Sequence, residues 1–450
     1  MSSIQEKKMI EKPGVTGKKP PRMVVAPSTN IIGTVTRVGR KYPEMAELRS
    51  PLFDFYLASD PALIQEILVT HHKNFVKGDF LQRTKKVFGE GLLTSEGDFH
   101  HRQRRLVQPA FNHASIAGYA GVVTSYTDRV LNEWNDEEIL DIHGEMTRLT
   151  MAIVAKCLFN EDVEGQSGSL SQSLTDIIEY FNRLSSPFAW LLEKLPSNKM
   201  YSRAIEQVDR MVYSMIEDRR KTGSDPGDLL SMLLSARDLD GGAMSEKQVR
   251  DEALILFAAG HETTANALSW TWYLVSQHPD VAAKLQEEVD SLLGKTNPPT
   301  FSDVPKLTYA TNVFTEAMRL YPPAWILTRQ ATKDCTIGEY LVPEGTDVLM
   351  SQFVVHHDPR FFENPEKFDT DRWTKEMRTK FPRFAYFPFG GGPRSCVGEP
   401  FAWMEGVLII SRMAQGWNLS LAQKNKVEML PRITLRPKNG IKMKVTKRKE

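Results

Sequence analysis

FPFGGGPRSCVGEPFAWMEG, residues 387–406, is a glycine-rich loop that runs directly into an amphipathic helical pattern. Three consecutive glycines and Pro393 make the loop tight, and it ends at Cys396, where the helical pattern begins. A thiolate at that point lies beside free backbone N–H groups of the helix, which hydrogen-bond the sulfur and lower its pKa. Gly398 has no side chain, so these amides can approach the sulfur closely. The loop therefore predicts a ligand cysteine, with a buried inert cysteine beside a turn as the alternative.

The cofactor that such a cysteine could bind follows from the residues that are missing around it. No second Cys or His lies near Cys396 in the sequence, which excludes a zinc site with four protein ligands. A single thiolate is enough when a macrocycle provides the other ligands, as in haem proteins. The loop therefore indicates haem with an axial cysteine.

The loop also matches the pattern F-x-x-G-x-R-x-C-x-G at every fixed position, through Phe389, Gly392, Arg394, Cys396 and Gly398. This pattern resembles the cysteine-ligand loop of the cytochrome P450 family. Other segments of the chain also resemble motifs of that family and occur in the family's order. The resemblance implies a mainly α fold with a small β region, in which a long central helix lies over haem b and the cysteine loop lies beneath it. It also implies that Cys396 is the iron ligand and that Phe389 and Gly398 contribute to cofactor binding.

The composition is that of an ordinary globular protein, with 41% hydrophobic and 25% charged residues. A net charge of +1 gives no overall basic field, which argues against nucleic acid as a partner. Cys157, Cys335 and Cys396 are too widely spaced for a disulfide framework and suit a reducing compartment. The N-terminus lacks an apolar signal core, and no run approaches the ~20 apolar residues of a membrane span. We therefore expect a soluble, cytoplasmic monomer without a transmembrane anchor.

The chain shows no internal repeat and no Gly/Ser-rich linker. We therefore expect a polar, proline-containing segment over residues 1–40 and a single haem-thiolate monooxygenase domain over residues 41–450. CTIGEYLVPEGTDVLM (335–350) predicts short strands around turns, and ITLRPKNGIKMKV (433–445) predicts a terminal hairpin. Helical patterns dominate the region between about residues 100 and 318.

The longest predicted helix starts at a capping box formed by Ser245 and Gln248. Its periodic pattern continues to Gln277, and Pro279 then stops it. In its middle, AAGHETT (258–264) interrupts an apolar run with a glycine, an acid and two hydroxyl groups. Such an interruption in a buried helix calls for a structural or chemical reason.

Ala259, Gly260, Glu262 and Thr263 match the A/G-G-x-D/E-T pattern that the P450 family carries in this helix. A mid-helix glycine costs about 1 kcal/mol relative to alanine, and the resemblance implies that Gly260 leaves space for oxygen. It further implies that Thr263 donates a hydrogen bond to that oxygen and that Glu262 relays protons from solvent. The alternative is that Thr263 and its neighbour Thr264 bond back to carbonyl groups of their own helix.

A charged motif precedes the cysteine loop. Glu316 and Arg319 are three residues apart on one helix face, close enough for an ion pair, which taken alone would be a solvated surface pair. Their order before Arg372 matches the family's E-x-x-R motif and its downstream arginine. The resemblance implies that these three residues form a buried network behind the loop. Removing one partner from such a network should cost about 3–5 kcal/mol.

A second group of cations is expected around the propionates of haem. His100 and Arg104 are four residues apart on one face of a short helix, where a cationic pair could bind the two carboxylates. Arg329 and Arg394 match the other propionate-binding positions of the family, although each alone could be a surface cation. The remaining cations of these segments could form a basic patch that docks an acidic electron donor, or simply a solvated face: His101, Arg102, Arg105, Lys380 and Arg383.

The candidate substrate contacts are apolar side chains, which implies a hydrophobic small molecule. Ile255 and Ala259 share one helical face with Thr263, because the three are spaced four residues apart. The other candidates come from their positions in the family, and each could instead be core: Phe80, Val87, Leu92, Ala324, Ile326, Leu327 and Leu430.

The resemblance implies a monooxygenase that inserts one atom of O2 into a hydrophobic small molecule: RH + O2 + two electrons + two protons → ROH + H2O. No flavin or iron–sulfur module is recognisable, so we expect electrons from a separate ferredoxin- or flavodoxin-type donor with its reductase. A long-chain fatty acid is slightly preferred as substrate over a terpenoid or a steroid. Two alternatives are a peroxide-dependent haem-thiolate enzyme and a haem-binding sensor without turnover.

Overall fold

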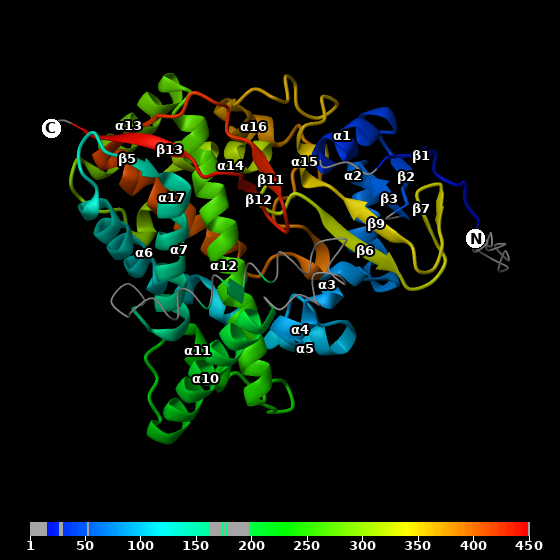
Figure 1. The fold of residues 1–450 in the computed structure, drawn as a ribbon, viewed down its shortest axis with the longest axis horizontal. Helices are drawn as coiled ribbons and strands as arrows, with labels where there is room; N and C mark the ends of the chain where they lie inside the picture. Colours follow the sequence, from blue (N-terminus) through cyan, green and yellow to red (C-terminus); the bar gives the residue numbers. More distant parts are fainter. Residues whose placement is uncertain are drawn as a thin grey trace.

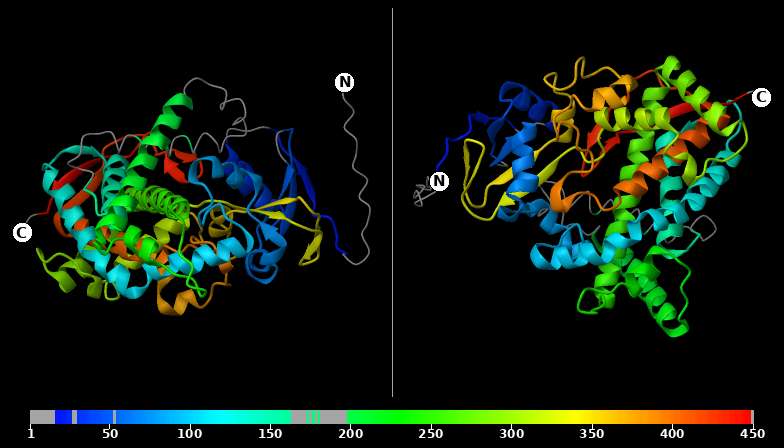
Figure 2. Two further views of the ribbon diagram at one scale, coloured as in Figure 1. Left: turned by 90° about the horizontal axis from the view of Figure 1, so that it is seen from below. Right: turned by 180° about the vertical axis from the view of Figure 1, so that it is seen from behind.

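The computed structural model describes residues 16–26, 30–51, 54–162 and 198–448, together with Ser173, Asp176, Ile177 and Tyr180. A large helical part and a smaller β-rich part lie on either side of the long helix α12 (Glu246–Val275) in Figure 1. The two views of Figure 2 show the same division, with the N-terminal and yellow strands grouped away from most of the helices. The expected mainly α fold with a small β region is confirmed.

Helix α12 begins as the sequence predicts. Ser245 Oγ accepts a hydrogen bond from Gln248 N at 3.2 Å, and Gln248 Oε1 accepts one from Ser245 N at 2.8 Å. The helix ends at Val275, two residues before the predicted end. The other described α-helices are α1 (Ile31–Lys41), α2 (Pro61–Gln65), α3 (Asp79–Arg83), α4 (Lys85–Phe88), α5 (Gly97–Val107), α6 (His113–Glu133), α7 (Ile142–Phe159), α10 (Asn198–Thr222), α11 (Leu229–Ser235), α13 (Pro279–Leu293), α14 (Thr308–Leu320), α15 (Gln352–His356), α16 (Lys375–Arg378) and α17 (Glu399–Gly416).

The described strands form one large sheet and three small ones. The large sheet has the order β1-β2-β3-β9-β6-β4, and the small sheets are β10-β13-β5, β11-β12 and β7-β8. The strands are β1 (Arg22–Val24), β2 (Met45–Arg49), β3 (Asp54–Ala58), β4 (Phe75–Val76), β5 (Ile139–Asp141), β6 (Leu327–Ala331), β7 (Cys335–Ile337), β8 (Tyr340–Val342), β9 (Asp347–Met350), β10 (Trp417–Leu421), β11 (Met429–Pro431), β12 (Leu435–Pro437) and β13 (Lys442–Lys447).

The strands predicted within residues 335–350 are confirmed as β7, β8 and β9. The predicted C-terminal hairpin is wrong, because its two strands belong to different sheets. β12 pairs with β11, whereas β13 pairs with β10 and β5. An alternating apolar pattern identifies a strand but does not identify its partner. Here both strands pair with segments outside residues 433–445.

The N-terminal part of the domain starts before residue 41. β1 pairs in parallel with β2, so residues 22–24 are already part of the large sheet. α1 spans the predicted boundary and buries Ile32, Val35 and Val38. Apolar residues at this spacing form one face of an amphipathic helix, which the polar composition of the segment concealed. Residues 1–15 lie outside the described part.

Helix α12 occupies the middle of the main apolar core and packs against α7, α14 and α17. A helix that is surrounded on most sides is expected to be apolar around most of its circumference. Polar groups in its middle are therefore the exception that needs an explanation. No helix among the described residues is both long enough and apolar enough to cross a membrane.

Candidate functional site

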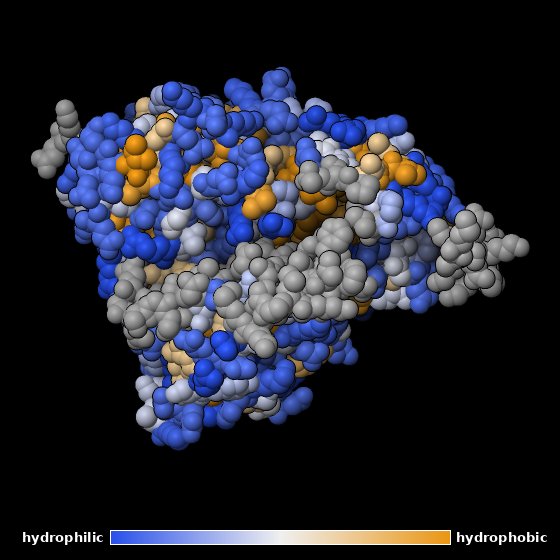
Figure 3. All heavy atoms as spheres, in the orientation of Figure 1, coloured by the Kyte–Doolittle hydropathy of each residue, from blue (hydrophilic) through white to orange (hydrophobic). Residues whose placement is uncertain are grey.

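Two residues far apart in the sequence are exposed although they lie in well-packed segments. Ala259 is exposed in the middle of α12, between stretches of buried residues, and Cys396 is exposed at the start of α17. Exposure of an alanine halfway along a central helix indicates a hollow beside that helix. Figure 3 shows a recess with an apolar floor near the centre of the face viewed there. A hollow between the long helix and the cysteine loop is the arrangement that the sequence implies for a large planar cofactor.

The shape of the cysteine loop depends on its glycines. Gly392 has φ +67°, and a Cβ at this position would collide with the carbonyl oxygen of Leu68, so both backbone and space exclude a side chain. Cys396 N donates to Phe389 O at 2.9 Å, which closes the loop. At Gly398, by contrast, an added Cβ would lie at an ordinary 3.9 Å from Cys396 Sγ. Glycine is therefore required by the backbone and the available space at position 392, whereas position 398 has room for a Cβ.

The environment of the sulfur differs from the prediction. Solvent reaches the side chain of Cys396, yet the surrounding protein atoms raise the pKa of its thiol. The backbone N–H groups of Gly398 and Glu399 and the charge of Arg104 lower the pKa, but they do not reverse the shift. The predicted effect of the helix amides is confirmed, since both lower the pKa, but desolvation by the surrounding protein atoms outweighs them and the net shift is upward. Because a coordinating metal deprotonates a thiol outright, the raised pKa is compatible with a ligand role.

Basic side chains gather beside the loop, and burial is the first cause of a lowered pKa for each of them. Arg394 further lowers the pKa of three of the others by repulsion. Glu96 pairs with Arg394 and supplies a carboxylate at one side of the group. An anion placed among these side chains would relieve the repulsion. The group, called the cationic cluster below, consists of Lys77, His100, Arg104, Arg329 and Arg394.

His100 is the neutral member of the cationic cluster. Burial and the nearby cations lower its pKa to about 3, so the ring is uncharged at neutral pH. Arg104 therefore carries the charge of the predicted His100–Arg104 pair in this structure, and the role of the pair at a propionate stays a prediction. Ser95 Oγ lies 3.4 Å from His100 Nδ1, whereas Nε2 is buried and has no hydrogen-bond partner among the described residues. A buried polar atom without a partner is costly, so Nε2 marks a position for a polar group of a ligand.

Lys77 is a member of the cationic cluster that the sequence analysis missed. Its Nζ donates to Leu93 O at 2.6 Å, and burial and Arg329 hold its pKa well below the usual range. Strand pairing explains its position, because β4 ends at Val76 and pairs with β6, which carries Arg329. A single lysine in FVKGD matches no motif, and its burial was not visible from the sequence.

Replacing Lys77 with methionine is expected to weaken haem retention by about tenfold, the effect of losing one buried charge-assisted contact of about 1.5 kcal/mol. The matched control is Lys73→Met, because Lys73 is exposed on the same segment. The rate of haem transfer to an acceptor apoprotein measures the difference. Equal rates for both variants would show that Lys77 does not contact the cofactor.

The centre of α12 contains the back-bonding that was considered as an alternative. Thr263 Oγ1 donates to Ala259 O at 2.6 Å. A hydroxyl has one hydrogen, so Thr263 offers lone pairs to a ligand in this rotamer and must rotate before it can donate. Gly260 also has a packing reason: an added Cβ would lie 3.1 Å from Cγ2 of Val154 in α7, which is a tight contact. Space for oxygen is therefore not needed to explain Gly260.

Glu262, one residue before Thr263, is held by the segment around β12. Its Oε1 accepts a hydrogen bond from Thr434 Oγ1 at 2.6 Å and lies 4.0 Å from Arg436 Nη1. Asn266 Nδ2 donates to Thr434 Oγ1 at 3.1 Å from the next turn of α12. Neither Thr434 nor Asn266 was singled out from the sequence, because 172 residues separate Thr434 from Glu262.

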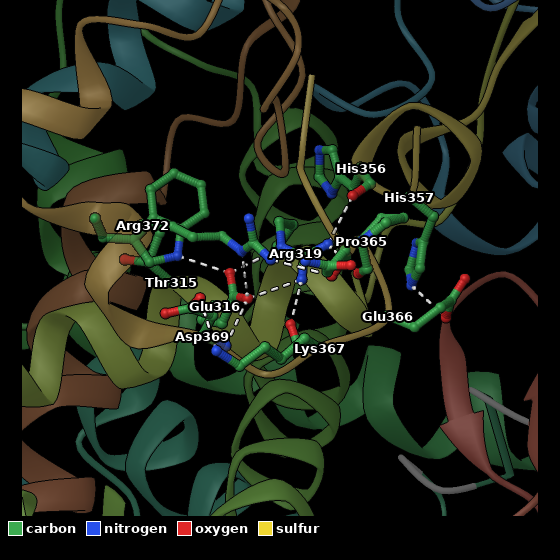
Figure 4. A network of polar contacts seen from close by, with 12 residues as sticks. Thr315, Glu316, Arg319, His356, His357, Pro365, Glu366, Lys367, Asp369 and Arg372 are labelled. Carbon is green, nitrogen blue, oxygen red and sulfur yellow. Dashed lines mark hydrogen bonds and ion pairs between the residues drawn. The ribbon is translucent and has the colours of Figure 1, made fainter. Parts of the chain in front are cut away.

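The structure brings together the three residues of the predicted charged network (Figure 4). Arg319 binds both carboxylate oxygens of Glu316, at 2.8 and 2.7 Å, and both side chains are 0% exposed. Arg372 Nε lies 3.4 Å from Glu316 Oε1. Trp373 Nε1 and the backbone N–H of Asp369 also donate to Glu316, at 2.8 and 3.0 Å. The carboxylate is therefore fully surrounded by donors.

The charged network connects to the cysteine loop through a histidine. Arg319 Nη1 donates to His356 O at 2.8 Å, and the ring Nε2 of His356 accepts from Phe387 N at 3.1 Å. Burial holds the pKa of His356 well below its usual range, so the ring is neutral and able to accept. Phe387 is the first residue of the loop segment, and the sequence analysis did not identify His356. The network thus supports the loop through one side chain.

The candidate substrate residues fall into two groups. Ala259 is exposed, and four others are partly buried and still reachable: Ala324, Ile326, Leu327 and Leu430. Ile255, Val87 and Leu92 are buried members of the main core, with 4%, 1% and 8% exposure, so the core alternative describes them better. The side chain of Phe80 lies outside the described residues.

Four of the five cations of the predicted basic patch are exposed, and whether they form one docking surface stays a prediction. His101, Arg105, Lys380 and Arg383 are exposed. Arg102 instead pairs with Asp238, with its Nε 2.8 Å from the carboxylate, so part of its charge is neutralised.

The residues around the cysteine loop can be compared with the groups that haem presents, an iron and two carboxylates. Within the described residues no group of three His, Cys, Asp or Glu side chains could hold a bare metal ion. The cationic cluster and the unpartnered His100 Nε2 suit a cofactor that carries carboxylates. The exposed Cys396 supplies the ligand type that haem iron accepts. The residues present therefore fit the group.

Fold and site together define a class of mainly helical proteins that bind a large acidic cofactor beside a cysteine loop. A sequence model of that class, described as Cytochrome P450, matches residues 23–445. The chain therefore belongs to the cytochrome P450 family, which implies haem, O2 and a redox partner.

Relatives support the family and its chemistry. The chain is 36% identical over 397 residues to cyclooctatin synthase of Streptomyces melanosporofaciens, covering 87% of this chain and 86% of that protein. It is 34% identical to the cyclooctat-9-en-7-ol 5-monooxygenase of the same organism, covering 84% and 82%. The crystal structure of the cytochrome P450DA heme domain superposes with a TM-score of 0.87 at 25% identity, covering 96% of this chain and 98% of that one. The protein is a P450 monooxygenase that acts on hydrophobic substrates.

Proposed function

We propose that the chain hydroxylates a cyclic terpenoid and that the sulfur of Cys396 would hold haem b. The exposed alanine in the middle of α12 carries this proposal, because Ala259 gives a hydrophobic substrate room to approach the long helix. Similarity to a monooxygenase that acts on cyclooctat-9-en-7-ol favours a cyclic terpenoid over the fatty acid that was slightly preferred from the sequence. Ala324, Ile326, Leu327 and Leu430 would form the rest of the apolar wall.

The cationic cluster would hold the two propionates of the cofactor. Arg104, Arg329, Arg394 and Lys77 would supply charge, and His100 would supply an N–H donor from Nε2. When bound, haem supplies the iron at which O2 is activated and from which oxygen is transferred to the substrate. Phe389 and the backbone amides of Gly398 and Glu399 would surround the sulfur.

Proton delivery would belong to Glu262 and Thr263. Glu262 is a carboxylate in the middle of α12, one residue before Thr263, and would relay protons from solvent toward the hollow. Thr263 Oγ1 would rotate away from Ala259 O to donate into the hollow. Electrons would come from a ferredoxin- or flavodoxin-type protein that binds at the exposed cations His101, Arg105, Lys380 and Arg383. The chain that receives them would form a single domain that extends from β1 to β13.

A binding screen tests the substrate class. Cyclic terpene hydrocarbons and alcohols are expected to shift the haem of the purified protein from low to high spin, and a reconstituted redoxin system should convert a binding compound into a hydroxylated product. Linear fatty acids of similar carbon number are the comparison. Spin shifts and products from fatty acids alone would overturn the terpenoid proposal.

Replacing Thr263 with alanine is expected to lower the product formed per O2 consumed by at least about tenfold, with hydrogen peroxide released instead, because a positioned proton-transfer group contributes about 10²–10⁴-fold to its step. Thr263→Ser keeps a hydroxyl and should retain most of the coupling. Oxygen-electrode and product measurements on the same sample give the ratio. Unchanged coupling in Thr263→Ala would remove the proposed role and leave the back-bond as the function of this side chain.

A further inference from the structure

The side chain of Glu262, the acid of the proposed proton pathway, is hydrogen-bonded to a β-hairpin. Glu262 is 8% exposed, and its Oε1 accepts a hydrogen bond from Thr434 Oγ1 at 2.6 Å. Arg436 Nη1 lies 4.0 Å from the same oxygen. Thr434 and Arg436 belong to the hairpin of β11 and β12, so this hairpin determines where the carboxylate points.

The direction of the hydrogen bonds around Thr434 follows from its other partner. Asn266 Nδ2 donates to Thr434 Oγ1 at 3.1 Å, which occupies a lone pair of the hydroxyl. The single hydroxyl hydrogen is then available for Glu262, which accepts it. Thr434 is 5% exposed, so solvent does not readily compete for this hydrogen.

Helix α12 fixes the hairpin at three successive turns. Glu262, Asn266 and Trp270 are spaced four residues apart and share one face of the helix. The first two bind the side chain of Thr434, and Trp270 Nε1 donates to Leu435 O at 2.9 Å. The same hairpin carries Leu430, a candidate substrate contact, in β11.

We infer that Thr434 is a positioning residue for Glu262, through which the β11–β12 hairpin sets the supply of protons to the oxygen-activation site. The inference rests on the proposed role of Glu262. The side chain of Arg436 is 25% exposed, so the Glu262–Arg436 pair meets solvent on the side of this hairpin. A substrate that presses on Leu430 would therefore act on the segment that orients the acid.

Three variants test the inference in the haem-loaded protein with a reconstituted redox system. Thr434→Val removes the hydroxyl at nearly constant volume, Thr434→Ser keeps it, and Glu262→Ala removes the group that is positioned. The readouts are product formed per O2 consumed, the substrate concentration for half of the spin shift, and the thermal midpoint. We expect Thr434→Val to lower coupling by about three- to tenfold and Thr434→Ser to restore it, with the spin-shift midpoint unchanged.

The double variant distinguishes the positioning role from a merely structural one. Thr434→Val should lower coupling no further in the Glu262→Ala background, and the two losses in thermal midpoint should be smaller together than their sum. Wild-type coupling in Thr434→Val, or an equal loss with and without Glu262, would overturn the inference while the role of Glu262 stands. Wild-type coupling in Glu262→Ala would instead overturn the proposed role of Glu262, and the inference with it.

Discussion

Replacing Glu316 with alanine is expected to lower the free energy of unfolding by about 3–5 kcal/mol, the range for a buried ion pair that loses one partner. The guanidinium of Arg319 is 0% exposed and would lose both of its contacts with the carboxylate. Its remaining acceptors are the backbone carbonyls of His356, Pro365 and Lys367, which carry no charge to balance it. Trp373 Nε1 would lose its acceptor, and Arg372 would lose its ion-pair partner. The loss is therefore greater than that of a single hydrogen bond.

Chemical unfolding followed by tryptophan fluorescence measures this loss. The matched control is Glu366→Ala, because Glu366 forms an exposed ion pair with Arg40 at 3.2 Å. Exposed pairs contribute little, so this variant should stay within about 0.5 kcal/mol of the wild type. A similar small change in both variants would contradict the energetic role of the buried network.

The same variant should also loosen the cysteine loop. Arg319 holds the backbone of His356, and His356 accepts from the first amide of the loop at Phe387. If the network collapses, this amide loses its fixed partner and the loop loses a support at its beginning. Faster loss of haem in Glu316→Ala than in Glu366→Ala is the expected sign.

The sequence predicted best what depends on local spacing. The cysteine loop, the capping box of α12 and the E-x-x-R pair each lie within a few residues, so a fixed pattern is enough to place them. Gly392 illustrates the limit, because its collision partner is the carbonyl of Leu68, more than 300 residues earlier. The motif identified the glycine, and the fold supplied the reason.

The charge state of the site was not predictable from residue types. The spacing of His100 and Arg104 predicts a cationic pair, but burial among other cations leaves His100 neutral. The pKa of Cys396 is raised although solvent reaches its side chain, because desolvation by the surrounding protein atoms outweighs the helix amides. Lys77 was missed because strand pairing of β4 with β6 places it. Each case depends on solvent exclusion, which is a property of the folded chain.

Replacing Cys396 with serine is expected to abolish the red-shifted absorbance that the reduced carbon monoxide complex of a thiolate-ligated haem shows. Monooxygenase activity should fall at least about 100-fold, which corresponds to about 2.7 kcal/mol in the activation barrier. The reason is electronic, because a thiolate pushes electron density toward the oxygen and a hydroxyl does not. Haem itself should still bind, since the cationic cluster is unchanged.

The control for Cys396→Ser is Cys335→Ser, which changes a free cysteine in β7, a strand paired with β8. Cys335 lies in a separate two-stranded sheet, so its replacement should leave the spectrum as it is. Haem content, measured on both variants, separates loss of the ligand from loss of the cofactor. A red-shifted carbon monoxide complex that persists in Cys396→Ser, at normal haem content, would show that another cysteine binds the iron. Because Cys157 is buried in the core and Cys335 lies in β7, such a result would also overturn the placement of the cofactor between α12 and the cysteine loop.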